Sequence, residues 1–171
     1  MMRSLKIMTW LLLIIIGFEK TTASDEESMR SAEQVEKSSS FNYSLQVFKS
    51  PTCGCCQRWI DHINEGNIAT TITNTEKMSK IKSENKILTH YQSCHTAISL
   101  EGFVFEGHIP ATTIRRFLDN PPNDAFGLAV TGMPIGSPGM EMGGRHDDYE
   151  VLLLKRDGSS AVYEKIIGHT H

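Results

Sequence analysis

The sequence lacks the features that mark several large classes of protein. Its 17 basic residues do not outnumber its 20 acidic residues, so it has no basic excess with which to bind nucleic acid. Its longest apolar run stops short of the ~20 residues that span a bilayer, which excludes a multi-span membrane protein. Four cysteines in 171 residues are too few for a small disulfide-stapled scaffold. One globular domain of ordinary size remains.

Common catalytic patterns are also missing. The chain has no evident carboxylate pair, serine nucleophile or phosphate-binding glycine loop. What it does have is sulfur and imidazole, in four cysteines, eight methionines and seven histidines. The placement of these side chains therefore carries the functional argument.

The N-terminus has the pattern of a secretory signal. A short basic segment precedes an apolar run at residues 7–18, and small residues at 21–23 offer a cleavage site. We predict a signal peptide over residues 1–23. An uncleaved membrane anchor is the alternative, because Glu19 and Lys20 lie between the apolar run and the cleavage site.

Residues 24–40 are almost entirely polar or charged and contain no aromatic side chain. Such a composition cannot bury enough apolar surface to fold, so we predict a disordered linker. No internal repeat or second linker follows. The remaining chain, residues 41–171, is predicted to form one domain.

The first half of this domain alternates between strand and helix patterns. The predicted elements are a strand at 43–48, a helix at 57–65, a strand at 68–73 and a helix at 75–86. A β-α-β-α order makes the two strands parallel neighbours.

The second half contains two predicted hairpins separated by a helix and a long loop. The predicted elements are strands at 96–100 and 103–106 around Glu101-Gly102, a helix opened by Pro110 and ended by Pro121-Pro122, a Gly, Pro and Met loop at 127–144, and strands at 149–155 and 161–166. The fold class is α/β, with a central mixed sheet and flanking helices. This order looks like the thioredoxin architecture, in which a cis-proline faces the cysteine loop at the place of Pro134. The sequence alone leaves the isomer of this bond open.

Three cysteines gather at the turn from the first strand to the first helix. Cys53, Cys55 and Cys56 contain both a Cys-x-Cys and a Cys-x-x-Cys pattern. A helix N-terminus stabilises the thiolate, which is both the nucleophile of disulfide exchange and a ligand for soft metals. A purely structural disulfide is the alternative, but it leaves three near-adjacent thiols unexplained.

A fourth cysteine, Cys94, could complete a tetrathiolate site. The spacing does not fit a zinc ribbon, and adjacent cysteines suit a multinuclear cluster of soft ions better than one tetrahedral ion. Met133 and Met140 in the long loop are further soft donors, with Met142 a weaker candidate. Soft donors select monovalent copper or silver.

Two histidines are candidate ligands beside the thiolates. His95 follows Cys94 directly and is either a ligand or a hydrogen-bonded surface residue. His108 lies between a predicted strand and a predicted helix, where it either binds metal or caps the turn. His62 falls on the polar side of the first helix, so we leave it out.

Four ordered blocks of sequence are similar to a known family. They are Ser50-Pro51-Thr52-Cys53-Gly54-Cys55-Cys56, Ser93-Cys94-His95-Thr96-Ala97, Glu106-Gly107-His108-Ile109-Pro110-Ala111, and Gly132-Met133-Pro134-Ile135-Gly136-Ser137-Pro138-Gly139-Met140-Glu141. They look like the signature blocks of the domain-of-unknown-function 411 family, which includes the CopG-like copper-resistance proteins. The blocks lie within residues 43–166. One departure is Thr131, where the family pattern leads us to expect proline.

The resemblance implies an exported, thioredoxin-like copper-binding protein of the Gram-negative periplasm. It makes Cys53, Cys55, Cys56 and Cys94 the thiolate set, which sequesters Cu(I) or changes its oxidation state. The implied partners are copper efflux or copper-carrying periplasmic proteins, with no nucleic acid and a membrane contact only if the signal segment stays uncleaved. Two other hypotheses remain open. One is a thiol-disulfide oxidoreductase using Cys53 and Cys56, with Cys55 incidental and Cys94 as the resolving thiol. The other is a plain structural domain.

Overall fold

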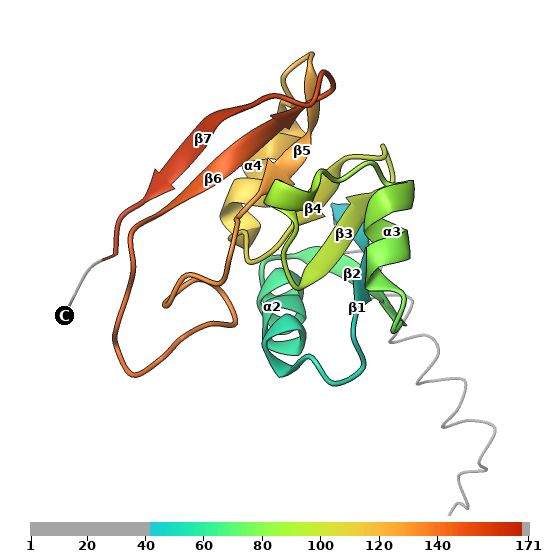
Figure 1. The fold of residues 1–171 in the computed structure, drawn as a ribbon. Coiled ribbons are helices and arrows are strands. Elements are labelled where there is room, and N and C mark those ends of the chain that lie inside the picture. The colour runs from blue at the N-terminus through green and yellow to red at the C-terminus, as the bar shows by residue number, and fades with distance from the viewer. Residues whose placement is uncertain (1–41, 169–171) are drawn as a thin grey trace, which may run out of the picture. The chain divides into compact units, whose positions relative to one another are not determined.

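The structure is a computed structural model that describes residues 42–168. The predicted signal peptide and the whole of the predicted linker lie outside these residues. Within them the chain forms a mixed α/β fold with a seven-stranded sheet in the order β2-β1-β3-β4-β5-β6-β7 (Figure 1). No helix in the described part is long and apolar enough to cross a membrane.

The predicted β-α-β-α order of the first half is confirmed. Its elements are β1 (Tyr43–Lys49), α2 (Gly54–Glu65), β2 (Ile68–Asn74) and α3 (Met78–Glu84). Strands β1 and β2 pair in parallel, as expected. Helix α2 begins three residues earlier than predicted, so all of Gly54, Cys55 and Cys56 lie in its first turn.

The second half follows the same chain order with one strand more than predicted. Its elements are η1 (Thr89–Tyr91), β3 (His95–Ser99), β4 (Val104–Glu106), α4 (Ala111–Asp119), β5 (Ala125–Ala129), β6 (Tyr149–Lys155) and β7 (Ser160–Ile166). Both predicted hairpins form, β3 with β4 and β6 with β7. The first has a longer connection than a two-residue turn, because β3 ends at Ser99 and the amide of Gly102 donates to the Ser99 carbonyl.

Strand β5 is the element that the sequence prediction missed. The predicted long loop began at Gly127. In the structure Gly127 belongs to β5 and pairs in parallel with Val104 of β4. A Cβ at Gly127 would lie 1.8 Å from the Val104 carbonyl oxygen, so this strand needs glycine for a close backbone approach. The long loop therefore begins after Ala129. Every described peptide bond is trans, including the bond before Pro134, whose isomer the sequence left open.

The core lies mainly between the sheet and helices α2 and α4. Leu45 and Val47 alternate along β1 and meet Trp59 and Ile63 of α2, while Phe117 anchors α4. Each such side chain contributes roughly 1.5–3 kcal/mol by leaving water. A smaller cluster that includes Tyr91 of η1 covers the other face of the sheet. The two clusters hold the ends of β1, β3 and β4 in fixed relative positions.

Candidate metal centre

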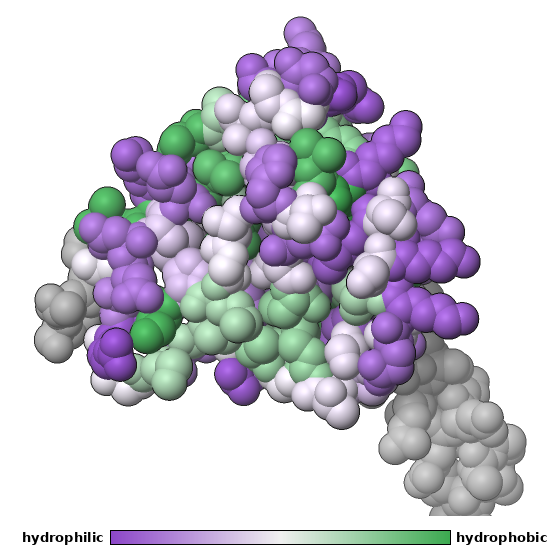
Figure 2. Space-filling model, in the orientation of Figure 1, coloured by the Kyte–Doolittle hydropathy of each residue, from purple (hydrophilic) through white to green (hydrophobic). Residues whose placement is uncertain are grey.

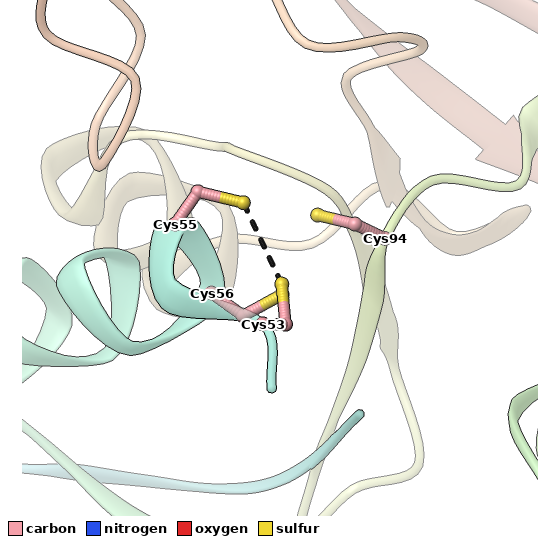
Figure 3. Close-up of side chains that lie close together, drawn as sticks. All are labelled: Cys53, Cys55, Cys56 and Cys94. Atoms are coloured by element: carbon pink, nitrogen blue, oxygen red, sulfur yellow. Dashed lines mark hydrogen bonds between the residues drawn. A yellow bond between two sulfur atoms is a disulfide. The ribbon is translucent and has the colours of Figure 1, made fainter. Parts of the chain in front are cut away.

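The cysteine loop connects the end of β1 to the start of α2. The Cys53 amide donates to the Ser50 carbonyl (3.1 Å), and Cys53 is the residue that caps α2. Cys56, in the first turn of the helix, is fully buried. Cys53 and Cys56 form a disulfide with their Cα atoms 5.4 Å apart (Figure 3). The Cys-x-x-Cys pair is thus oxidised in this structure.

The other two cysteines are free and half-buried. Cys94 precedes β3, and β3 pairs antiparallel with β1 so that His95 lies opposite Lys49. This register brings Cys94 to the end of β1 where the cysteine loop begins. All four Sγ atoms lie within 4.8 Å of one another, although 38 residues separate Cys56 from Cys94 (Figure 3).

Two imidazoles reach the same sulfur. Cys94 Sγ is 3.1 Å from His108 Nε2 and 3.3 Å from His95 Nδ1. The Nδ1 of His108 is 2.8 Å from the Pro138 carbonyl oxygen, which can only accept a hydrogen bond, so Nδ1 carries the proton. In the neutral ring Nε2 then offers its lone pair toward Cys94. This is the arrangement of a metal-ligating histidine with an oriented ring.

His95 is fully buried against Trp59, with ring centroids 4.2 Å apart. Burial, reinforced by the neighbouring His108 and Lys82, holds the pKa of His95 well below its usual value. The ring is therefore neutral, as a ligand must be. Its Nε2 has no hydrogen-bond partner within the described residues, which is a costly state for a buried polar atom. The alternative of a surface residue is excluded.

The electrostatics around Cys94 disfavour a thiolate without a nearby positive charge. Burial, followed by the charge of Cys55, raises the pKa of Cys94 to about 12. The thiol therefore keeps its proton at neutral pH unless a positive charge compensates for the lost hydration. A metal ion supplies that charge and displaces the proton.

The long loop touches the site through its backbone. Gly139 (φ +82°) lies so close to α2 that a Cβ would be 2.6 Å from the Cys55 carbonyl oxygen. The Arg58 guanidinium donates to the Gly139 carbonyl (3.0 Å), and Pro138 accepts from His108 as described above. In Figure 2 the surface over α2 and this loop is weakly hydrophobic, whereas the surface over α3 is more hydrophilic.

The methionines of the loop are placed differently from the cysteines. Met133 is 55 % exposed and lines a surface pocket with Pro134 and Tyr149, in which no cysteine takes part. Met142 is 54 % exposed, and Met140 is half-buried. The structure thus brings together the four cysteines, His95 and His108, and it leaves Met133 at the solvent surface.

A buried ion pair behind Cys94 escaped the sequence prediction. Lys82 of α3 and Glu106 of β4 pair with each other, and Thr96 donates to the same carboxylate (2.6 Å). Burial raises the pKa of Glu106, and the Lys82 ammonium is the largest influence opposing that rise. The sequence held one sign of this pair: Lys82 lies on the otherwise apolar side of its amphipathic helix, where a buried lysine needs a partner.

Comparisons with known proteins agree with this geometry. A family described as "Protein of unknown function, DUF411" matches residues 91–140. Two solved structures of a "Copper resistance protein copG" are similar over 73 % of this chain and 98 % of theirs. Form 2 has 37 % sequence identity and a TM-score of 0.69, and form 1 has 38 % identity and a TM-score of 0.68. No curated protein matches.

Fold and site define a mixed α/β protein with a candidate metal centre built from clustered thiols. Within that class, the family is specified by the sequence identity and coverage of the solved relatives, and by the matching family pattern. The chain belongs to the DUF411 family of CopG-like proteins.

Proposed function

We propose that this protein is an exported copper-binding protein that sequesters or redox-processes Cu(I) through its cysteine cluster. The observation that carries the proposal is the meeting of four cysteine sulfurs, from α2 and the start of β3, within 4.8 Å. Thiolates are the soft ligands that Cu(I) prefers, and silver(I) shares that preference. Copper is the cargo or substrate of this site, and its binding as a multinuclear cluster follows from the adjacency of Cys55 and Cys56.

Redox state controls how many ligands the site offers. With Cys53 and Cys56 bridged, only Cys55 and Cys94 can become thiolates. Two electrons and two protons added to the disulfide release two more thiols and complete the set. His95 and His108 add nitrogen donors beside Cys94. Oxidation reverses the change and releases copper.

The setting of the site is also part of the proposal. The names of the solved relatives support a role in copper resistance. The predicted signal peptide supports export to a Gram-negative periplasm, where copper efflux or copper-carrying proteins are the partners. We further propose that β1-α2-β2, with its cysteines at the strand-to-helix turn, is the core of a thioredoxin-like fold.

The test is an anaerobic titration of the reduced full chain with Cu(I) against a competing chelator. We expect more than one equivalent to bind and X-ray absorption at the copper edge to show sulfur ligation, with nitrogen as a minor part. Cys55→Ser should lower the stoichiometry, whereas Ser83→Ala, an exposed change on α3, should not. Binding of less than one equivalent by the reduced wild type rejects the proposal.

A second candidate function is thiol-disulfide oxidoreduction. The observation favouring it is the Cys53–Cys56 disulfide, in which Cys53 is partly accessible and Cys56 is buried. In the reduced protein, Cys53 would attack a substrate disulfide and Cys56 would displace it, so that two electrons pass to the substrate, which leaves as two thiols. Turnover of insulin that survives Cys55→Ser would support this function; absence of turnover would reject it.

A further inference from the structure

We propose that Glu106 is a positioning residue of the copper site, and that it holds Cys94 in place through the Ser93 backbone amide before it and the Thr96 hydroxyl after it. The inference rests on the proposed function only in taking Cys94 as a copper ligand. Glu106 touches no sulfur. It acts on residues 93 and 96, which flank the Cys94-His95 pair.

The contacts of Glu106 are specific and buried. One carboxylate oxygen, Oε1, accepts from the Ser93 amide (2.6 Å) and from Lys82 Nζ. The other, Oε2, accepts from the Thr96 hydroxyl (2.6 Å), and Lys82 Nζ also donates to Thr96 Oγ1 (3.0 Å). Glu106 and Thr96 are fully buried, and Lys82 is 5 % exposed. The carboxylate therefore binds the residue before Cys94, Ser93, and the residue after His95, Thr96.

The same segment is tied to the long loop and to β4. The Ser93 hydroxyl donates to the Gly132 carbonyl (3.0 Å), and the Gly107 amide donates to the His95 carbonyl (3.3 Å). Gly107 (φ +78°) leaves no room for a side chain, since a Cβ would lie 2.8 Å from Ser93 Oγ. With Glu106 in place, Ser93 is fixed on three sides, and the direction of Cys94 is fixed with it.

Lys82 has a supporting role, which is to neutralise the carboxylate. A buried carboxylate without a counterion would be costly, and so would the ammonium alone. Lys82 is the buried residue of α3, and its charge is felt by His95. The helix is therefore held against β3 and β4 by the same pair that positions the thiol.

The test compares two uncharged double variants, because a single Glu106→Ala would strand the Lys82 charge and risk unfolding. Lys82→Met/Glu106→Gln keeps an amide oxygen that accepts from the Ser93 amide. Lys82→Met/Glu106→Leu has no acceptor there. Glu164→Gln is the control, because Glu164 also accepts from a threonine and from a cation, Thr113 and Arg116, but its partners lie on α4.

The first readout needs no copper. In the full chain with its disulfide intact, iodoacetamide labels Cys55 and Cys94, and peptide mass spectrometry gives their ratio of rates. We expect the leucine double to change this ratio by roughly fivefold or more, since one buried hydrogen bond corresponds to about that factor. The glutamine double and Glu164→Gln should leave it near the wild-type value. Equal ratios in both doubles overturn the proposal.

Two further readouts keep the inference testable if the leucine double does not fold. In the wild type, the Ser93 amide should exchange hydrogen at least roughly tenfold more slowly than the exposed Gly143 amide; equal exchange overturns the proposal. In Cu(I) titration, the glutamine double should bind as the wild type does. If the wild type binds no copper but the labelling ratio changes as expected, the copper function fails while the positioning role stands.

Discussion

The two sides of the candidate metal centre are held in different ways. On the cysteine side, the four sulfurs are carried by the residue before β3 and by the N-cap and first turn of α2, close to buried side chains such as Trp59. On the loop side, the contacts with the site are made by carbonyl groups, and the methionines Met133 and Met142 face solvent. Whether a soft donor can act as a fixed ligand therefore depends on the helix or strand that carries it. Its presence in the sequence is not sufficient.

The largest expected effect is the difference in Cu(I) affinity between losing Cys94 and losing the loop methionines. Cys94→Ser should weaken Cu(I) binding by at least roughly 100-fold, the upper end of what even outer-shell changes cost a metal site. Met133→Leu/Met142→Leu, which conserves volume, should weaken it by less than about threefold. Competition with a chelator measures both. A large loss in the methionine double would make the loop a ligand-bearing side and would remove the contrast.

The next effect separates the docked part of the loop from its free part. Gly139→Ala should lower the free energy of unfolding by about 2–4 kcal/mol, because it adds overpacking against α2 to the strain of a positive φ. Gly143→Ala has only the strain, since its Cβ would meet nothing within 4 Å, and should cost about 1 kcal/mol. Urea unfolding compares the two. Equal costs would mean that the loop does not dock through Gly139.

The smallest effect is a pH dependence of the α2 side. Burial lowers the pKa of His62 below its usual 6.5, and its Nε2 accepts from the Ala111 amide (3.0 Å). The unfolded chain takes up a proton near pH 6.5 and the folded chain only at lower pH, so stability is complete above 6.5 and is lost as the pH falls toward the folded pKa. His95 and His108 act in the same direction.

The melting temperature should therefore fall between pH 7.5 and 5. His62→Gln, which keeps an acceptor for the Ala111 amide, should reduce this fall, and the exposed His90→Gln should leave it unchanged. An unchanged slope in His62→Gln would show that the titration of His62 is not linked to folding.

Local patterns in the sequence were sufficient for most of the fold. Alternation in β1, the helical spacing of Trp59, Ile60 and Ile63, and the two hairpin patterns each depend on neighbours in the chain. The strand, the helix and both hairpins formed, with α2 starting three residues earlier than predicted. Strand β5 was missed because its stability comes from close contact with β4 at Gly127, which resembles a loop residue when read without that partner.

The cysteines of the candidate site could be picked out from the sequence, whereas the ion pair beside them could not. Three cysteines are adjacent in the sequence, and the family resemblance indicated Cys94 as the fourth. The ion pair of Lys82 and Glu106 could not be foreseen, because the two residues are 24 positions apart and meet only through the packing of α3 on the sheet.

The loop is anchored through three carbonyl groups, those of Gly132, Pro138 and Gly139, which accept from Ser93, His108 and Arg58. Carbonyl groups are common to all residues, so the anchoring does not depend on the exposed side chains at neighbouring positions 133 and 142. The side chains at those positions can be replaced without detaching the loop from the site. A library varied there, on an unchanged cysteine cluster, is a direct route to relatives that recognise new partners.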